Sequence, residues 1–308
     1  MFYMKSFIPR FAWLDGKFVK EDEAKVSVMT HAIHYGTSVF EGLRGYWNSK
    51  NLYIFRLDDH IKRFRNSGRI YSISLKFTNN EISNAIINLC KKNKIRNSCY
   101  IRPFYFVGRY GINLHITENA PTHAAIVVFP FGDLFNKNGI KAGVSSWRRI
   151  HDISTPPLAK MGGNYLNSIL ATQECKRNGY DEAILLDQLG NVSEAPGENI
   201  FLVRNKKLIT PPTSSSALEG ITKDSVIKIA QDMEYEVIER EITRTELYLA
   251  DEIFLTGTAA EITPVISIDG KKIGVGRSGN ITKKLRSIYS GIVLGRNEKY
   301  SHWVTSVY

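Results

Sequence analysis

A polar stretch in the middle of the chain constrains the fold more than any other feature. Between Trp147 and Ala159 the sequence carries two arginines, a His-Asp pair and a double proline, without apolar periodicity. Such a stretch is typical of a linker. Because 308 residues are enough for two hydrophobic cores, we predict a small domain over residues 1–146, a linker over 147–159 and a larger domain over 160–308.

The first half of the chain combines helical and strand periodicity. Apolar residues recur at helical spacing over residues 57–75 and again over 79–94. Strands are predicted at residues 99–107, 124–131 and 140–147. This alternation predicts a mixed α/β domain.

The second half is dominated by short strands. Helices are predicted over residues 165–177 and 221–233, the first ending at a glycine signal. Turn-forming residues separate strands predicted at 183–186, 199–203 and 207–210, a pattern that indicates antiparallel hairpins. We predict a barrel-like sheet with helices beside it.

The chain is basic, with a formal net charge of +11. This charge suggests an affinity for anions, which include nucleic acid, acidic membrane surfaces and small phosphorylated or carboxylated ligands. The positive residues occur in short clusters, however, and no zinc-finger or RNA-recognition signature accompanies them. A basic nucleic-acid-binding protein is therefore kept only as a distant alternative.

Other observations concern the compartment and metals. Cys90, Cys99 and Cys175 are odd in number and widely separated, which supports neither a CxxC redox pair nor a secreted disulfide framework. No apolar run reaches transmembrane length. His31 and His34 have no third ligand nearby, so no metal site is predicted. We expect a cytoplasmic protein with no membrane or nucleic-acid partner.

Lys160 is the first candidate for chemistry, because the segment from Pro156 to Tyr165 contains no other charged side chain. An ammonium among apolar and small groups is poorly hydrated, which favours the neutral amine that attacks an aldehyde. Taken alone, the segment is more typical of an ordinary snorkelling lysine ahead of a helix. Lys160 is thus a candidate for an imine with an aldehyde cofactor such as pyridoxal phosphate.

Such a cofactor needs an acid partner for its ring nitrogen and a cradle for its phosphate. Glu194 lies among small residues that let a ring approach closely, although a turn glutamate is the ordinary interpretation. For the phosphate, the segment 219–224 opens a helix whose N–H groups and positive dipole end suit an anion. The turn at 256–261 offers a second such place, and either one alone is more often a helix cap.

Tyr100 and Arg102 are candidates for substrate binding. The period of two in a strand puts the hydroxyl and the guanidinium on one face. The planar fork of a guanidinium matches the two oxygens of a carboxylate. The alternative is an exposed pair on an edge strand.

Together these segments resemble the branched-chain amino acid aminotransferases, which are fold-type IV pyridoxal-phosphate enzymes of aminotransferase class IV. The resemblance runs nearly end to end and rests on residues 31–42, 100–102, 163–166, 193–199 and 257–265. It implies an α/β (α+β) fold with a small N-terminal α/β domain and a larger C-terminal domain whose barrel-like sheet is flanked by helices. It also implies ping-pong transamination of leucine, isoleucine and valine with 2-oxoglutarate, through an internal aldimine at Lys160.

The resemblance further implies the site residues, with Lys160 also moving the proton at the substrate Cα. Cofactor contacts would come from Arg63, Lys160, Tyr165, Glu194, Ile221, Thr222 and Thr258. Substrate contacts would come from Tyr35, Phe40, Gly42, Tyr100, Arg102, Trp147, Thr258 and Ala259. Within the second set, Tyr100 and the 258–259 amides would bind the α-carboxylate, and Arg102 the distal carboxylate of glutamate. Its helical position alone places Arg63 on a solvated basic face.

The resemblance also concerns assembly and leaves alternatives open. In the family, the loop that corresponds to residues 109–114 closes the active site of a neighbouring subunit, which implies a homodimer or a dimer-based larger assembly. D-amino acid transaminase, amine transaminase and aminodeoxychorismate lyase share the fold. The Tyr-x-Arg and Gly-Thr-Ala-Ala-Glu segments favour the branched-chain enzyme, whereas residues 109–111 and 148–151 show no close match.

Overall fold

The computed structural model describes residues 9–308, and its contacts divide the chain into two compact units. Unit 1 comprises Met1–Gly132, Ala159–Gly163 and Gly291–Tyr308, and unit 2 comprises Asp133–Leu158 and Asn164–Ser290. These limits differ from the predicted domain boundaries in three places. Residues 291–308, predicted in the C-terminal domain, join unit 1, where β17 (Val304–Ser306) pairs with β5 (Leu52–Phe55). The Lys160 segment joins unit 1 because it bonds to a strand there, and residues 133–146 join unit 2 because their strand pairs within its sheet.

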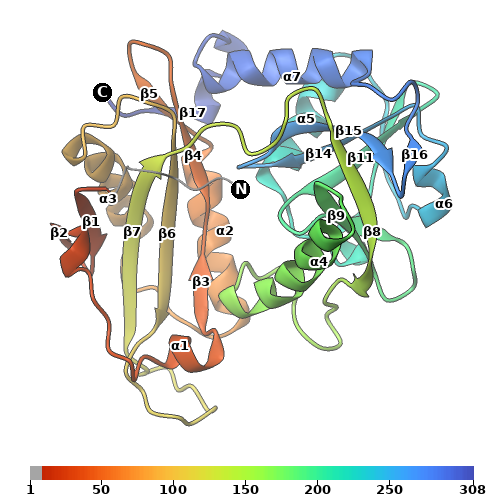
Figure 1. Cartoon of the computed structure of the whole chain (residues 1–308). Helices are drawn as coiled ribbons and strands as arrows, with labels where there is room; N and C mark the ends of the chain where they lie inside the picture. Colours follow the sequence, from red (N-terminus) through yellow and green to blue (C-terminus); the bar gives the residue numbers. More distant parts are fainter. Residues whose placement is uncertain (1–8) are drawn as a thin grey trace. The chain divides into compact units, whose positions relative to one another are not determined.

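An eight-stranded sheet forms the centre of unit 1, in the order β17-β5-β4-β6-β7-β1-β2 with β3 paired to β6. All its pairs are antiparallel, and β6 and β7 pair along their whole length (Figure 1). The strands are β1 (Phe11–Leu14), β2 (Lys17–Lys20), β3 (Ser38–Phe40), β4 (Leu43–Trp47), β5 (Leu52–Phe55), β6 (Cys99–Val107), β7 (Thr122–Pro130) and β17 (Val304–Ser306).

Unit 1 contains the helices α1 (His31–Tyr35), α2 (Leu57–Ile70) and α3 (Asn79–Lys92), with 3-10 turns at Glu21–Glu23 and Glu298–Trp303. Helices α2 and α3 pack apolar faces into the core of this unit. Ile61 and Phe64 of α2 share one buried core with Leu89 of α3 and the strands. The predicted helix over 57–75 ends at Ile70, because Ser72 adopts the left-handed conformation with φ 54°.

Unit 2 is built on a nine-stranded sheet in the order β10-β9-β8-β15-β14-β11-β12-β13, with β16 paired to β15. The predicted hairpin of residues 199–203 with 207–210 is confirmed as the antiparallel pair β11–β12. The strand predicted at 183–186 does not pair with 199–203, because β9 pairs antiparallel with β10, a strand that the sequence pattern did not predict. The pairs β8–β9, β8–β15 and β12–β13 are parallel. The strands are β8 (Ile140–Arg148), β9 (Glu182–Leu186), β10 (Val192–Glu194), β11 (Asn199–Arg204), β12 (Lys207–Thr210), β13 (Val237–Glu239), β14 (Glu252–Gly257), β15 (Glu261–Ile268) and β16 (Lys271–Lys272).

The remaining helices are α4 (Tyr165–Arg177), α5 (Ile221–Asp232), α6 (Arg244–Leu247) and α7 (Asn280–Val293), with 3-10 turns at Gly162–Asn164 and Thr213–Ser215. Helix α4 has the predicted bounds and packs Ala171 and Cys175 against Ala183 and Leu185 of β9. The left-handed Gly179 (φ 80°) follows its end, as a C-terminal glycine does. In the described part of the chain, 9–308, we find no helix whose length and apolarity would allow it to cross a membrane.

Candidate active site

Lys160 is fixed between a strand and a helix of unit 1. Its backbone N–H donates to Ser67 Oγ of α2 at 3.0 Å, and its carbonyl accepts from the backbone N–H of Phe40 at 3.1 Å. The ammonium lies 5.0 Å from the centre of the Phe40 ring. The neighbours Ala159 and Met161 are buried. Two hydrogen bonds therefore fix the backbone of Lys160, and its amine lies near an aromatic ring.

A buried acid, Glu41, follows Phe40 in the chain and binds the side chains of two residues of α2. Arg63 donates to Glu41 through Nε (2.6 Å) and Nη2 (2.9 Å), which makes a bidentate ion pair. His60 Nδ1 lies 2.8 Å from the same carboxylate. Arg63 is 12% exposed in this arrangement, so its assignment to a solvated helix face, drawn from helical position alone, is wrong.

The electrostatics of this cluster follow from burial and mutual charge. Burial alone would raise the pKa of the Glu41 carboxyl, but Arg63 and His60 outweigh it and hold that pKa well below its usual range. Burial also lowers the pKa of His60, against the attraction of Glu41. We therefore assign His60 as a neutral ring whose Nδ1–H donates to the Glu41 carboxylate, which can only accept.

Tyr100 and Arg102 lie on one face of β6 as predicted, and Arg102 Nη2 donates to the Tyr100 hydroxyl at 3.1 Å. The Arg102 guanidinium lies 4.5 Å from the centre of the Phe40 ring and 5.2 Å from that of Tyr100. Strand β6 pairs on both sides, so the edge-strand alternative is wrong. Arg102 Nε is buried and finds no hydrogen-bond partner within the described residues 9–308.

The residues around this pair are closely fitted. A Cβ on Gly42 would lie 1.8 Å from the Tyr100 hydroxyl oxygen, so only glycine leaves Tyr100 in place. Tyr35 is exposed, and its hydroxyl donates to the carbonyl of Ile112 at 3.0 Å. The Phe40–Gly42 segment and the loop at 109–114 thus both border the predicted substrate residues of unit 1.

In unit 2, Glu194 at the end of β10 is 4% exposed and accepts three hydrogen bonds. They come from Arg149 Nε at 2.8 Å, Asn199 Nδ2 at 3.1 Å and the backbone N–H of Leu218 at 3.0 Å. All three partners are donors, and a carboxylate has about four lone-pair sites, so Glu194 Oε1, which accepts only from Arg149, keeps an acceptor site for a further donor. The orientation of Glu194 is therefore fixed from three directions.

Two turns of unit 2 border this carboxylate network. Gly220 precedes the first residues of α5, Ile221 and Thr222, and a Cβ on Gly220 would lie 1.8 Å from Asn199 Oδ1. The β14–β15 turn begins beside the same asparagine, because Thr256 pairs with Asn199. The buried Thr256 Oγ1 has no hydrogen-bond partner inside the part of the chain that the structure describes. A helix N-terminus and an unpartnered hydroxyl therefore lie near one asparagine.

The structure distributes the predicted site residues over both units. Unit 1 carries Tyr35, Phe40, Gly42, Arg63, Tyr100, Arg102 and Lys160, and unit 2 carries Trp147, Tyr165, Glu194, Ile221, Thr222, Thr258 and Ala259. Trp147 is an exposed residue near the end of β8, and Tyr165 begins α4. His31, by contrast, is satisfied by Thr37 Oγ1 and the carbonyl of Asn113.

Three residues of these clusters, Glu41, His60 and Arg149, were missed from the sequence. Glu41 stands alone as a charge in the apolar run Val39-Phe40-Glu41-Gly42-Leu43, which is a signal for a buried, paired carboxylate. Arg149 falls in the stretch predicted as a linker, yet it is 5% exposed and bonded to Glu194. No local pattern identifies its partner.

The donor set fits pyridoxal phosphate, which presents an aldehyde, a phosphate, a ring nitrogen and a ring hydroxyl. Lys160 offers an amine, Arg63 a guanidinium and the start of α5 backbone N–H groups, while Glu194 offers a carboxylate and Tyr165 a hydroxyl. The unpartnered Thr256 hydroxyl adds a donor beside the α5 turn. Each unit thus provides part of the chemistry that this cofactor needs.

Comparison with known proteins agrees with this chemistry. The amino-transferase class IV family matches residues 38–268. The branched-chain-amino-acid aminotransferase of Salmonella typhimurium is 44% identical over 301 residues, which cover 96% of this chain and 97% of the relative.

Solved structures give the same result. The branched-chain aminotransferase of Thermoproteus uzoniensis with norvaline has a TM-score of 0.94 at 46% identity and covers 97% of this chain and 99% of its own. A T.th. branched-chain amino acid aminotransferase complexed with N-(5'-phosphopyridoxyl)-L-glutamate has a TM-score of 0.95 at 43% identity, covering 98% and 100%. The predicted fold class is confirmed. The chain belongs to the class IV aminotransferases and, within them, to the family of the branched-chain amino acid aminotransferases.

Proposed function

We propose that this chain transfers the amino group of leucine, isoleucine or valine to 2-oxoglutarate, giving branched-chain 2-oxo acids and L-glutamate in a ping-pong reaction. The observation that carries the proposal is the Phe40 ring, which has the Lys160 ammonium and the Arg102 guanidinium within 5.0 and 4.5 Å of its centre. An amine that reacts with carbonyl carbon and a group that binds carboxylate thus share one apolar wall.

Class IV aminotransferases use pyridoxal 5′-phosphate, and we propose which residues of this chain bind it. Arg63, Thr258 and the backbone N–H groups of Ile221 and Thr222 would hold the phosphate, and Tyr165 the ring hydroxyl. Glu194 would keep the ring nitrogen protonated. When bound, the cofactor supplies an aldehyde that accepts the amino group and a ring that withdraws electrons. Lys160 would react with the aldehyde carbon and move the proton at the substrate Cα.

The substrate residues address a selectivity problem, because one site must accept a branched hydrocarbon in one half-reaction and a second carboxylate in the other. Tyr35, Phe40, Gly42 and Trp147 would form the wall for the hydrocarbon. Tyr100 and the 258–259 amides would bind the α-carboxylate, and Arg102 the distal carboxylate. The names of the related structures support both demands, since they include norvaline and a phosphopyridoxyl-glutamate.

Single half-reactions test this function against its alternatives. The purified pyridoxal form is mixed with L-leucine, D-alanine or a primary amine, and its visible absorbance is followed. We expect the fastest colour change with L-leucine. A faster change with D-alanine or the amine would indicate a D-amino acid or amine transaminase, and no change with any of the three an aminodeoxychorismate lyase. A chain with no bound chromophore whose nucleic-acid affinity falls steeply with salt would support the nucleic-acid alternative.

Arg102→Ala is expected to slow the 2-oxoglutarate half-reaction by about 10- to 100-fold, because a hydrogen bond to a charged group contributes about 1.5–3 kcal/mol. The leucine half-reaction should change much less, since the leucine side chain has no carboxylate. Stopped-flow rates of the two half-reactions measure both effects. Equal losses in the two half-reactions would refute the assignment of Arg102.

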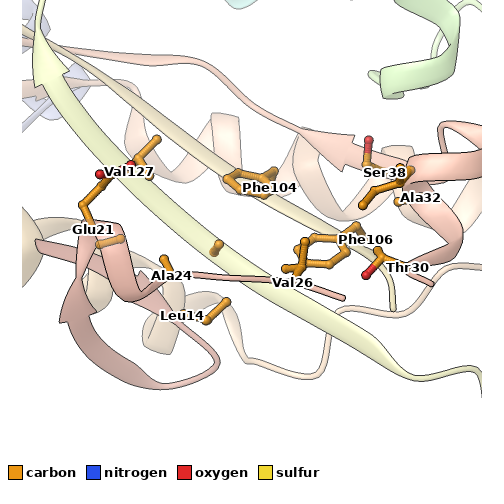
Figure 2. A pocket seen from close by; sticks show the side chains of 13 residues that line it. Leu14, Glu21, Ala24, Val26, Thr30, Ala32, Ser38, Phe104, Phe106 and Val127 are labelled. Atoms are coloured by element: carbon orange, nitrogen blue, oxygen red, sulfur yellow. The ribbon is translucent and has the colours of Figure 1, made fainter. Parts of the chain in front are cut away.

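We also propose that the chain forms a homodimer or a dimer-based larger assembly. Unit 1 exposes apolar side chains at residues 26–35 and 109–114, and two hydrogen bonds join these segments, from Tyr35 to Ile112 and between His31 and Asn113. Beside them, a cavity of about 380 Å³ is lined mostly by apolar residues, among them Val26, Phe104 and Phe106 (Figure 2). Exposed apolar side chains gathered in one region support a protein interface.

The state of the cysteines supports a cytoplasmic location, which we propose. Cys90, Cys99 and Cys175 are free and buried. Burial raises the pKa of the Cys175 thiol to about 11, so it has little thiolate character near neutral pH. Free thiols of this kind are typical of reducing compartments.

A further inference from the structure

Glu41 is the one charged residue of its segment and the most deeply buried acid of unit 1. It follows β3 directly, between the proposed pocket residues Phe40 and Gly42, and it is 0% exposed. Its carboxylate accepts from Arg63 Nε and Nη2, and His60 Nδ1 and the backbone N–H of Gly42 lie at 2.8 and 3.2 Å. The carboxylate is thus completely surrounded by donors.

Such a group is costly for the fold alone. Removing a carboxylate from water costs several kcal/mol, and apolar replacements of a buried ion pair are often as stable as the pair. The core around it, with Val39, Leu43 and Phe64, is apolar. Stability by itself therefore does not explain why this position carries an acid.

The geometry at Arg63 does explain it. The Nε–Nη2 edge of the guanidinium lies against Glu41, and the guanidinium is planar, so the direction of its third nitrogen is fixed by the same two bonds. The arginine side chain otherwise has several rotatable bonds to order when it binds a ligand. A bidentate carboxylate removes that freedom before the ligand arrives.

We propose that Glu41, supported by His60, is a positioning residue that holds Arg63 in the orientation in which it binds the cofactor phosphate. The inference rests on the proposed function, because it takes Arg63 as a phosphate ligand. Burial lowers the pKa of His60, so its ring is neutral. A neutral ring can donate a hydrogen bond to Glu41 without competing with Arg63 for the negative charge. Because Phe40 and Gly42 flank Glu41, the same segment connects phosphate binding with the wall of the substrate pocket.

Glu41 acts on the phosphate in two opposite ways, which the test must separate. Its negative charge repels the phosphate, whereas its two bonds to Arg63 orient the ligand group. Glu41→Asp keeps the charge and hence the repulsion, but the side chain is one methylene shorter and cannot reach both Arg63 and His60 in the same geometry. A change in phosphate affinity in this variant therefore reports orientation.

The experiment compares pyridoxal phosphate with pyridoxal, which lacks the phosphate. The full chain is freed of cofactor and titrated with each compound, and dissociation constants are read from the absorbance of the bound form. In Glu41→Asp we expect the preference for pyridoxal phosphate over pyridoxal to fall at least about tenfold, the effect of one charge-assisted hydrogen bond. In an Arg63→Met background the same substitution should leave the reduced preference unchanged.

Glu81→Asp is the matched control, because it makes the same chemical change at an exposed capping residue of α3 and should leave the preference at its wild-type value. His60→Gln gives a second reading if Glu41→Asp does not fold, and it should lower the preference in the same direction. An unchanged preference in whichever of the two variants folds would overturn the inference. A wild-type chain that binds no pyridoxal phosphate would instead overturn the proposed function.

Discussion

Lys160→Ala is expected to lose the visible absorbance of the covalently held cofactor and to lower turnover by about 10²–10⁴-fold or more, the range that a positioned acid–base group contributes. The substitution removes the amine that we propose to react with the aldehyde and to move the substrate proton. It leaves the Ser67 and Phe40 hydrogen bonds intact, because both involve the Lys160 backbone. Absorbance spectra and both half-reaction rates measure the two losses separately.

The control for this prediction is Lys228→Ala. Lys228 lies on α5, forms an exposed pair with Asp224, and should leave spectrum and turnover unchanged. Small added amines should restore part of the proton transfer in Lys160→Ala, because the cavity left by the lysine side chain admits them. A variant that kept both the visible absorbance and turnover would remove Lys160 from its assigned role.

What the sequence predicted well is local. Helix α4 and strand β6 have their predicted bounds, since their signals, a glycine stop and a period of two, lie within the elements themselves. The end of α2 was placed too late, because the apolar pattern continues past Ile70 while the backbone turns at Ser72. Periodicity reports which residues are apolar, and backbone dihedral angles are not part of that signal.

What the sequence alone did not show depends on partners distant along the chain. Arg63 lies on a helix with several other basic residues, and nothing in the helix distinguishes it from them. Its burial is caused by Glu41, 22 residues earlier in the chain. Arg149 and Glu194 are 45 residues apart, and they meet because β8 and β10 both pair with β9. The family resemblance implies a role for Arg63 in phosphate binding, which stays a proposal, and the structure gives the physical reason for its position.

Glu194→Gln is the second substitution for which a large effect is expected. A neighbouring opposite charge shifts a pKa by about 1–3 units, so loss of the carboxylate charge that we propose as the partner of the ring nitrogen should lower turnover by about 10- to 10³-fold. Cofactor binding should largely persist, because the proposed phosphate and aldehyde contacts do not involve Glu194. Turnover and the cofactor dissociation constant, measured on the same variant, separate the two.

Glu194 also has a structural role, because Glu194→Gln leaves Arg149 buried without its charge partner. Breaking a buried pair costs about 3–5 kcal/mol of folding stability, so the melting temperature should fall as well. Arg149→Gln breaks the same ion pair but keeps the Glu194 carboxylate, which then has no guanidinium beside it. We expect it to lose similar stability and to retain most of its turnover.

An analogue of the cofactor makes the distinction independent of stability. In N-methylated pyridoxal phosphate the ring nitrogen carries a permanent positive charge, so it needs no acid partner. This analogue should restore part of the turnover lost in Glu194→Gln and should not raise the turnover of the wild type. If Arg149→Gln lost as much turnover as Glu194→Gln, and the analogue restored none of it, the Arg149–Glu194 pair would be a structural ion pair and the ring nitrogen would need another partner.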